Sequence, residues 1–135
     1  EKEIPIIKEI HILNTYIDIE RLRISENANI TFHHNEIKDS VKIAPMLLLP
    51  LIENAFKHGT DSTIETSYIK ASLSCNDKNL IFRCENSFKE LAMKDVGGIG
   101  IENVRKRLQL LYPTKHFFEI EKSKNVFKVT LEIKF

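Results

Sequence analysis

The chain has 135 residues, of which 42% are hydrophobic and 29% are charged, the usual balance of one soluble domain with one core. Its formal net charge of +1 provides no field that would favour nucleic acid or an anionic membrane as a partner. No apolar run is long enough to cross a bilayer. The 2 cysteines are too few for a disulfide framework or a cysteine-based zinc site, so we expect reduced core residues in a cytoplasmic domain.

The first predicted element is a helix over residues 4–24. Its buried stripe recurs at helical spacing and consists of Ile6, Ile10, Leu13 and Ile17. Lys8, Glu9 and Asp18 fall outside that stripe. Ile30 and Phe32 then alternate with polar neighbours, which indicates a short strand.

A second helix is predicted within residues 45–59. Pro45 suits the first turn of a helix, and Gly59 suits its end. Pro50 would remove a hydrogen bond and clash one turn back inside a helix, so we expect a bend or a late start there.

Residues 68–86 are predicted to form a β-hairpin around the turn at 76–79. Pairing Cys75 with Leu80 gives one apolar face, made of Ile69, Ala71, Leu73, Cys75, Leu80, Phe82 and Cys84. The same register places Asn86 on the buried face, opposite Ile69.

A loop at 87–97 precedes a third predicted helix at 101–111, which Tyr112-Pro113 ends. Its buried stripe is Ile101, Val104, Leu108 and Leu111. A last hairpin, 117–135, points Phe118, Ile120, Phe127, Val129, Leu131 and Ile133 inward. The pattern predicts an α+β fold, a two-layer sandwich with helices on one face of a mixed, mostly antiparallel sheet.

Polar residues interrupt the apolar pattern on the second helix. Asn54, Lys57 and His58 share one side of it, at positions i, i+3 and i+4. The Asn54 amide oxygen can ligate Mg²⁺, and Lys57 can neutralise phosphate charge. The alternative, which spacing alone favours, is a solvated helix face whose terminal cations complement the helix dipole.

Two further interruptions follow along the chain. A buried amide at Asn86 needs hydrogen-bond partners and can read the edge of a base, or it simply opens the next turn. The glycines of 97–100 precede a helix, so backbone can approach a phosphate at a helix N-terminus. The alternative is a flexible loop end before a helix.

Three segments together resemble the LytS/YehU-like sensor histidine kinases. PMLLLPLIENAFKHG, residues 45–59, resembles the family's N-box, and GIGIENVRKRLQLLYP, residues 98–113, resembles its glycine box and following helix. Residues 16–23 resemble the segment just before the ATP-binding fold. The resemblance covers nearly the whole chain and implies the Bergerat (GHKL) ATP-binding fold, with ATP between the helices and a lid.

The resemblance also implies roles for individual residues. Asn54 would ligate a Mg²⁺ that bridges the phosphates of ATP, with Lys57 and His58 near those phosphates. Gly98 and Gly100 would form the lid hinge and phosphate turn. Asn86 falls where the wider superfamily has an aspartate that binds adenine. Glu53 is the candidate base or water-orienting group.

Three departures from the superfamily pattern bear on affinity. Asn86 lacks the charge of the usual aspartate, which predicts weaker adenine binding. Phe88 stands where a glycine usually follows, and Pro50 stands where a carboxylate is common. The short lid, 87–97, predicts a loosely covered ATP.

We expect residues 1–26 to be a helical segment that leads from a dimerisation region carrying the phosphoacceptor histidine, and residues 27–135 to be the catalytic domain. His11 lacks the family's Pro-His-Phe context, so the chain should bind ATP without phosphorylating itself. The resemblance implies a histidine protein kinase, a response regulator as partner, and a full-length homodimer anchored in the bacterial inner membrane.

Two other readings of the sequence remain. A degenerate, non-catalytic nucleotide-binding module would explain Asn86. An ATPase or a protein-serine kinase of the same fold, such as an anti-sigma factor kinase, is the other. No basic stripe or aromatic platform supports binding to nucleic acid.

Overall fold

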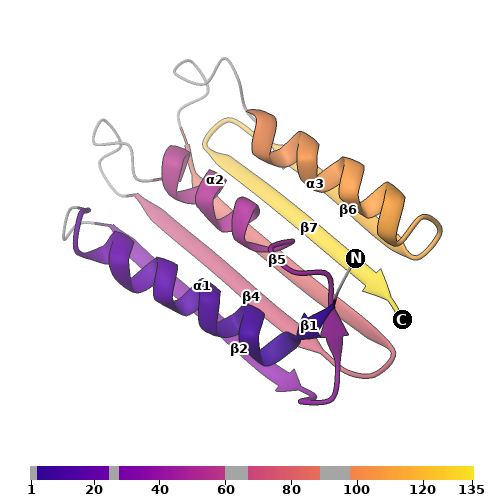
Figure 1. Cartoon of the computed structure of the whole chain (residues 1–135). Helices are drawn as coiled ribbons and strands as arrows, with labels where there is room; N and C mark the ends of the chain where they lie inside the picture. Colours follow the sequence, from indigo (N-terminus) through magenta and orange to yellow (C-terminus); the bar gives the residue numbers. More distant parts are fainter. Residues whose placement is uncertain (1–2, 25–27, 60–66, 89–97) are drawn as a thin grey trace.

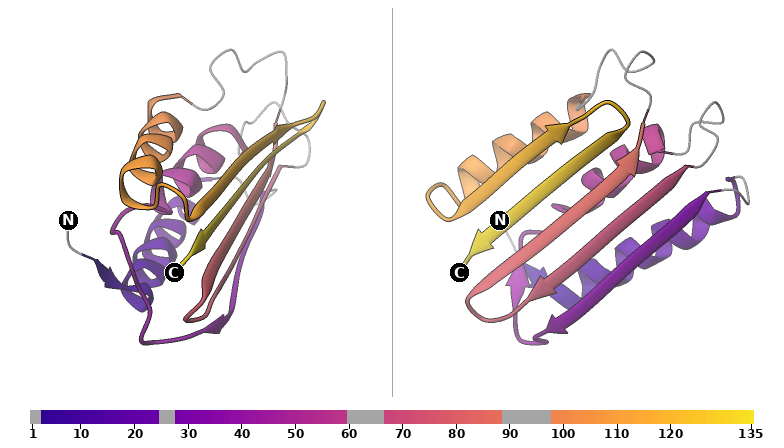
Figure 2. Two further views of the ribbon diagram at one scale, coloured as in Figure 1. Left: turned by 90° about the vertical axis from the view of Figure 1, so that its right-hand side faces the viewer. Right: turned by 180° about the vertical axis from the view of Figure 1, so that it is seen from behind.

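The computed structural model describes residues 3–24, 28–59, 67–88 and 98–135. Its helices form one layer over a 5-stranded sheet (Figure 1). The opposite face of the sheet carries no helix from the described part of the chain, as both views in Figure 2 show. The predicted α+β sandwich is therefore confirmed.

The elements follow one another in an interspersed order. They are β1 (Ile4–Pro5), α1 (Ile6–Arg21), β2 (Asn29–Ile37), β3 (Lys42–Ile43), α2 (Leu49–Gly59), β4 (Tyr68–Cys75), β5 (Asn79–Ser87), α3 (Gly98–Leu111), β6 (His116–Lys122) and β7 (Val126–Lys134). The large sheet has the order β2-β4-β5-β7-β6, in which β2 and β4 are parallel and the other pairs antiparallel. A separate antiparallel pair, β1 with β3, was not predicted because strands of 2 residues leave no periodic pattern.

The core lies between the helices and the inner face of the sheet. It contains the predicted stripe of α1 together with the inner residues of β4, β5 and β7. Leu111 on α3, and Phe118 and Ile120 on the edge strand β6, are half-buried rather than fully buried. Glu9 was predicted to lie outside the buried stripe of α1, and this is wrong, because the residue is 0% exposed.

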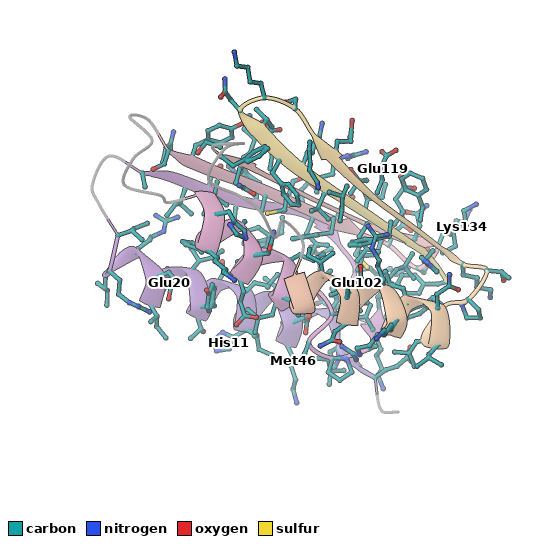
Figure 3. The ribbon with its side chains drawn as sticks, turned by 90° about the horizontal axis from the view of Figure 1, so that it is seen from above. His11, Glu20, Met46, Glu102, Glu119 and Lys134 are labelled. Carbon is teal, nitrogen blue, oxygen red and sulfur yellow. The ribbon has the colours of Figure 1, made fainter. Side chains whose placement is uncertain are left out.

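The outer face of the sheet carries alternating charges. Lys70, Glu85, Lys128 and Glu121 are neighbours across four adjacent strands. Opposite charges side by side on a sheet attract one another, which suits a face that meets water. Glu119, on the same outer face, lies on the side away from the helices in Figure 3.

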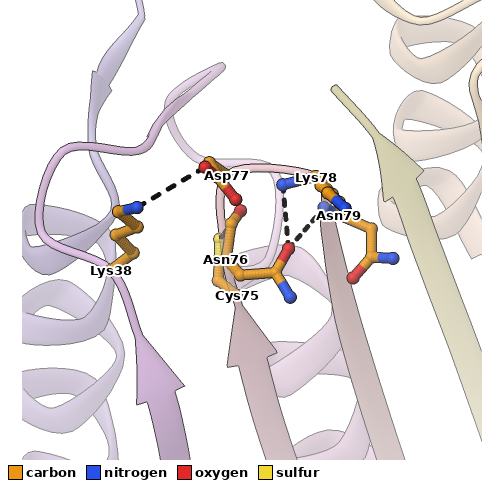
Figure 4. Close-up of polar contacts among 6 residues, drawn as sticks. All are labelled: Lys38, Cys75, Asn76, Asp77, Lys78 and Asn79. Atoms are coloured by element: carbon orange, nitrogen blue, oxygen red, sulfur yellow. Dashed lines mark hydrogen bonds and ion pairs between the residues drawn. The ribbon is translucent and has the colours of Figure 1, made fainter.

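The β4–β5 hairpin has the predicted register, with Cys75 opposite Leu80 and Ile69 opposite Asn86. The side chain of Asn76 closes the turn, since its Oδ1 accepts from the backbone N–H of Lys78 at 2.8 Å and of Asn79 at 2.9 Å (Figure 4). Lys38 Nζ lies 3.4 Å from Asp77 Oδ2 and links this turn to the end of β2.

The cysteines are free and buried, as expected. Cys84 pairs with Ala71 in the ladder, four positions from Cys75 along β4. Burial raises the pKa of Cys75 to about 11 and that of Cys84 to about 12, so both thiols stay protonated near neutral pH. In the described residues no helix combines the length and apolar character that a membrane span needs.

The start of α2 confirms one expectation and corrects another. The helix begins at Leu49, so Pro50 lies in its first turn, where a missing N–H costs nothing. The prediction that Pro45 lies in the first turn of the helix is wrong. Pro45 lies instead in a turn before the helix, next to Met46, whose φ is 59°. The third helix begins at Gly98, earlier than predicted, and the boundary expected between residues 26 and 27 lies outside the described residues.

Candidate functional site

One row of α2 carries two of the predicted site residues. Pro50, Asn54 and His58 follow one another at four-residue intervals, so they lie on the same side of the helix. Asn54 and His58 are half-buried, whereas Lys57 is exposed. The row thus offers an amide and an imidazole at the edge of the core, with an ammonium beside them.

Helix α3 lies beside the start of α2 and runs in the opposite direction. Tyr112, just after α3, accepts a hydrogen bond at 3.1 Å from the N–H of Ala44. At the other end, a Cβ built on Gly100 would lie 3.9 Å from Cβ of Pro50. Asn54, one turn beyond Pro50, therefore lies past the level of Gly100, at the N-terminal end of α3. A helix N-terminus attracts anions, and Asn54 lies on the side of α2 that carries Pro50, the residue next to Gly100.

His58 is set up as a neutral group. Burial, and then the positive charge of Lys57, lower the pKa of His58 below its usual value of 6.5. At neutral pH the imidazole therefore offers one donor and one acceptor, while Lys57 supplies the positive charge.

Glu53 lies on a different side of α2, facing α1. Burial, and then the charges of Glu20 and Glu53, together raise the pKa of Tyr16 on α1 to about 12. The ring of Tyr16 packs edge-on against Phe56, with 5.6 Å between the ring centroids. Glu53 itself is exposed, and the structure brings it toward α1 rather than into the row of Asn54 and His58.

Asn86 lies under the C-terminal end of α2. It is 1% exposed, and its Nδ2 donates to the carbonyl of Ser87 at 2.9 Å, which fixes the plane of the amide. A Cβ built on Gly59 would lie 2.8 Å from Cβ of Asn86 and 3.1 Å from Cγ1 of Ile69. Glycine is therefore needed at 59 for this close approach. Because Asn86 pairs within β5, it does not open a turn, which was the alternative from the sequence.

Phe88 follows the strand and is a core residue. It is 3% exposed, and its ring packs edge-on against Phe127 with 6.0 Å between centroids. The rest of the predicted lid, with Gly97, lies outside the described residues. Gly98 and Gly100 belong to the first turn of α3.

Sequence reasoning missed three side chains that fix α2. Ser87 Oγ accepts from the N–H of Tyr68 at 3.0 Å and donates to the carbonyl of Gly59 at 3.2 Å. Tyr112 binds Ala44 at the other end. Glu9 accepts from the backbone N–H groups of residues 46–48. No local pattern marks these residues, because each partner lies far away in the sequence.

The protein side chains alone do not complete the coordination of a divalent ion, so water or a bound phosphate would have to supply the remaining oxygen ligands. Among the described residues, no cluster of three or more His, Cys, Asp or Glu side chains is placed to hold a metal. The Asn54 oxygen is the ligand that α2 offers, and Mg²⁺ commonly takes one or two protein ligands with waters and phosphate oxygens.

Comparison with known proteins identifies relatives, although no protein-family model matches the sequence. The chain is 26% identical over 102 residues to the sensor histidine kinase BtsS of Escherichia coli K12, covering 75% of this chain and 18% of BtsS. It is 24% identical over 123 residues to the sensor protein LytS of Oceanobacillus iheyensis, covering 80% of this chain and 21% of LytS. The chain thus spans about a fifth of the length of these relatives.

Solved structures with the same fold are histidine kinase catalytic domains. The nucleotide-free catalytic domain of histidine kinase ThkA matches with a TM-score of 0.69 and 16% identity, covering 98% of this chain and 96% of that one. ThkA in complex with the response regulator protein TrrA matches with a TM-score of 0.60 and 15% identity, covering 98% of this chain and 41% of that one. The predicted resemblance is therefore confirmed: this chain is related to the LytS-like sensor histidine kinases and has the fold of a histidine kinase catalytic domain.

Proposed function

We propose that this chain is the ATP-binding catalytic domain of a sensor histidine kinase. It binds Mg-ATP and transfers the γ-phosphate to a histidine on a separate upstream segment. The observation that carries the proposal is the meeting of two distant sequence segments. Pro50 and Gly100 belong to the N-box-like and glycine-box-like segments, and the Cβ position of Gly100 lies 3.9 Å from Pro50.

In this proposal the triphosphate lies at the N-terminal end of α3. Asn54 holds Mg²⁺, Lys57 neutralises phosphate charge, and neutral His58 donates a hydrogen bond to a phosphate oxygen. Gly98 and Gly100 let the backbone approach the phosphates. Phosphoryl transfer depends mainly on positioning and charge neutralisation, which these groups supply.

Asn86 would receive the adenine. Its Nδ2 is already bonded to the carbonyl of Ser87, so its oxygen is the group that would accept from the adenine amino group. A neutral amide makes a weaker bond there than a carboxylate does. Glu53 is assigned as a base or water-orienting group only if a bound substrate reaches the α1 side of α2.

The wider context of the proposal follows from the relatives. The phosphate would pass from the upstream histidine to a response regulator, since ThkA is known in complex with one. Residues 1–26 would lead from the dimerisation segment into the catalytic domain, 27–135. The full-length protein would be a homodimer anchored in the bacterial inner membrane.

The first experiment is titration calorimetry with a non-hydrolysable ATP analogue, with and without Mg²⁺. Wild type should bind in a Mg²⁺-dependent manner, and Asn54→Ala should lose that dependence because it removes the proposed metal ligand. Asn14→Ala, an exposed asparagine on α1, is the matched control and should bind like wild type.

A second experiment tests the transfer step. The chain is mixed with a separate dimerisation segment of a LytS-like kinase and radiolabelled ATP. Acid-labile label on that segment is expected, since phosphohistidine is acid-labile. Binding without transfer would favour the degenerate module, acid-stable label would favour a serine kinase, and a folded chain without binding at millimolar analogue would refute the ATP site.

A further inference from the structure

Glu9 is a buried carboxylate that the proposed chemistry does not use. It lies on α1 and is 0% exposed, although α1 otherwise buries only aliphatic side chains. A buried carboxylate must be fully hydrogen-bonded, because an unpaired one costs several kcal/mol. Its partners therefore indicate what it is for.

The three N–H groups that donate to Glu9 lie in one short segment. Oε1 accepts from the N–H of Met46 at 3.1 Å, and Oε2 accepts from the N–H groups of Leu47 and Leu48, each at 3.1 Å. Leu48 is also the residue whose carbonyl accepts the first hydrogen bonds of α2. Glu9 therefore places a negative charge at the N-terminal end of α2, where the helix dipole favours it.

The segment that Glu9 holds is strained. Met46 has a φ of 59°, a left-handed conformation that costs a non-glycine residue energy and persists only where the surroundings enforce it. Its N–H is held by Glu9 from α1, and its carbonyl accepts from Arg107 of α3 at 3.2 Å. We call residues 44–48 the junction. Met46 marks its place on the helical side of the molecule in Figure 3.

We propose that Glu9 is a positioning residue that sets the place of α2, and with it Asn54 and His58, relative to the N-terminal end of α3. The inference rests on the proposed function, because it assigns Glu9 a role in the geometry of the same nucleotide site. The junction leads directly into α2, so a change at Met46 shifts the N-terminal part of the helix. Since Glu9 belongs to α1, the geometry of the site depends on where α1 lies.

The test is Glu9→Gln, which keeps the shape of the side chain. Both oxygens of Glu9 accept from N–H groups, and the amide replaces one of them with an NH₂ donor that must face another donor. Asp18→Asn is the matched control, because it makes the same chemical change at an exposed position of the same helix. Two readouts are taken on protein shown to be folded by circular dichroism: affinity for the Mg²⁺-loaded ATP analogue, and hydrogen exchange of each backbone amide.

We expect Glu9→Gln to weaken analogue binding about fivefold or more, the scale of a typical coupling between sites. Amides of residues 46–52 should exchange faster, while those of the β4–β5 hairpin keep their protection. Adding Met46→Gly to Glu9→Gln should restore part of the affinity, because glycine adopts a positive φ without strain. Asp18→Asn should change neither readout.

A purely structural role predicts the opposite pattern. Glu9→Gln would then lower the melting temperature while the folded protein bound the analogue like wild type, with faster exchange confined to the amides of residues 46–48 that lose their acceptor, and the proposal would be wrong. If Glu9→Gln does not fold, Arg107→Gln removes the other bond to Met46 and must shift both readouts in the same direction. If wild type binds no analogue, the proposed function fails, and the exchange of the α2 amides of Leu49, Leu51 and Ile52 still decides whether Glu9 positions α2.

Discussion

At its N-terminal end α2 is held by side chains that reach in from α1 and α3, and at its C-terminal end it is held by close packing against the sheet. Glu9, Arg107 and Tyr112 make the polar contacts at the first end. At the second end, Gly59 lies against Asn86, and a single hydroxyl, that of Ser87, bonds its carbonyl. The first end depends on where two other helices lie, whereas the second end is fixed to β5, the central strand of the sheet.

The two kinds of contact determine which end of α2 can move. Close packing has little tolerance for displacement, because interiors have no spare volume. The bond from Arg107 is exposed and can be exchanged for a bond to water at moderate cost. The bonds of Glu9 and Tyr112 come from other helical segments and can move with them. We therefore expect α2 to pivot about its C-terminal end, so that Asn54 moves while Gly59 stays in contact with Asn86.

The largest effect should come from Gly59→Ala. A methyl group there would lie 2.8 Å from Cβ of Asn86, which cannot swing away, so α2 must shift. We expect a loss of about 2 kcal/mol in the free energy of unfolding, the usual cost of overpacking. Urea denaturation measures it.

Gly100→Ala is the matched control for that substitution. Its new Cβ would meet only Pro50, at an ordinary 3.9 Å. Stability should stay within about 0.5 kcal/mol of wild type, whereas analogue binding should fall if Gly100 borders the phosphates. Equal losses of stability in the two variants would contradict the packing argument.

At the N-terminal end, Tyr112→Phe removes the acceptor of the buried Ala44 N–H. An unsatisfied buried donor costs about 1–2 kcal/mol, so the free energy of unfolding should fall by about that much. Tyr16→Phe serves as the control, because the ring contact with Phe56 is retained. Thermal melts of both variants should show the larger shift for Tyr112→Phe.

Alkaline pH should lower the free energy of unfolding through Tyr68, whose hydroxyl bonds Glu85 and whose backbone N–H bonds the Ser87 that holds Gly59. Burial, and then the contact with Glu85, raise the pKa of Tyr68 to about 12 from an ordinary value of 10.0. A raised folded pKa means that this stabilising contribution is full below pH 10 and is lost as the pH rises toward 12. Unfolding free energies between pH 8 and about 12 should therefore fall less steeply in Tyr68→Phe than in wild type.

The smallest expected effect is a gain from Met46→Gly. Glycine removes the strain of the positive φ at Met46 but makes the unfolded chain more flexible. The two terms nearly cancel, so the free energy of unfolding should rise by no more than about 1 kcal/mol. A clear loss of stability would show that the Met46 side chain, rather than its backbone, supports the junction.

Sequence reasoning predicted the C-terminal end of α2 better than the N-terminal end. The alternation in β4 and β5 is strict, so pairing Cys75 with Leu80 placed Asn86 opposite Ile69 correctly. The likeness of two motifs also led to the side of α2 that holds Asn54 and His58.

The N-terminal end could not be predicted because its bonds join distant residues. A helical pattern treats a glutamate as solvent-exposed, and nothing near Glu9 shows that its acceptors serve Met46, Leu47 and Leu48. Pro45 suits a helix start equally well one turn too early. The short β1–β3 pair and the contact of Gly59 with Asn86 likewise arise only from packing between elements.

The strand order of the sheet has a consequence for how the chain folds. The β4–β5 and β6–β7 hairpins close across turns at 76–78 and 123–125, so their contacts are local. Strand β2 instead pairs in parallel with β4, bringing Asn29 to Tyr68 across the whole of α2. Local pairings form quickly and distant ones slowly, because loop closure costs entropy before any contact is gained. We expect the backbone amides of both hairpins to become protected from exchange early in refolding. Strand β2, and the helix α2 that follows it in the chain before β4, should dock last.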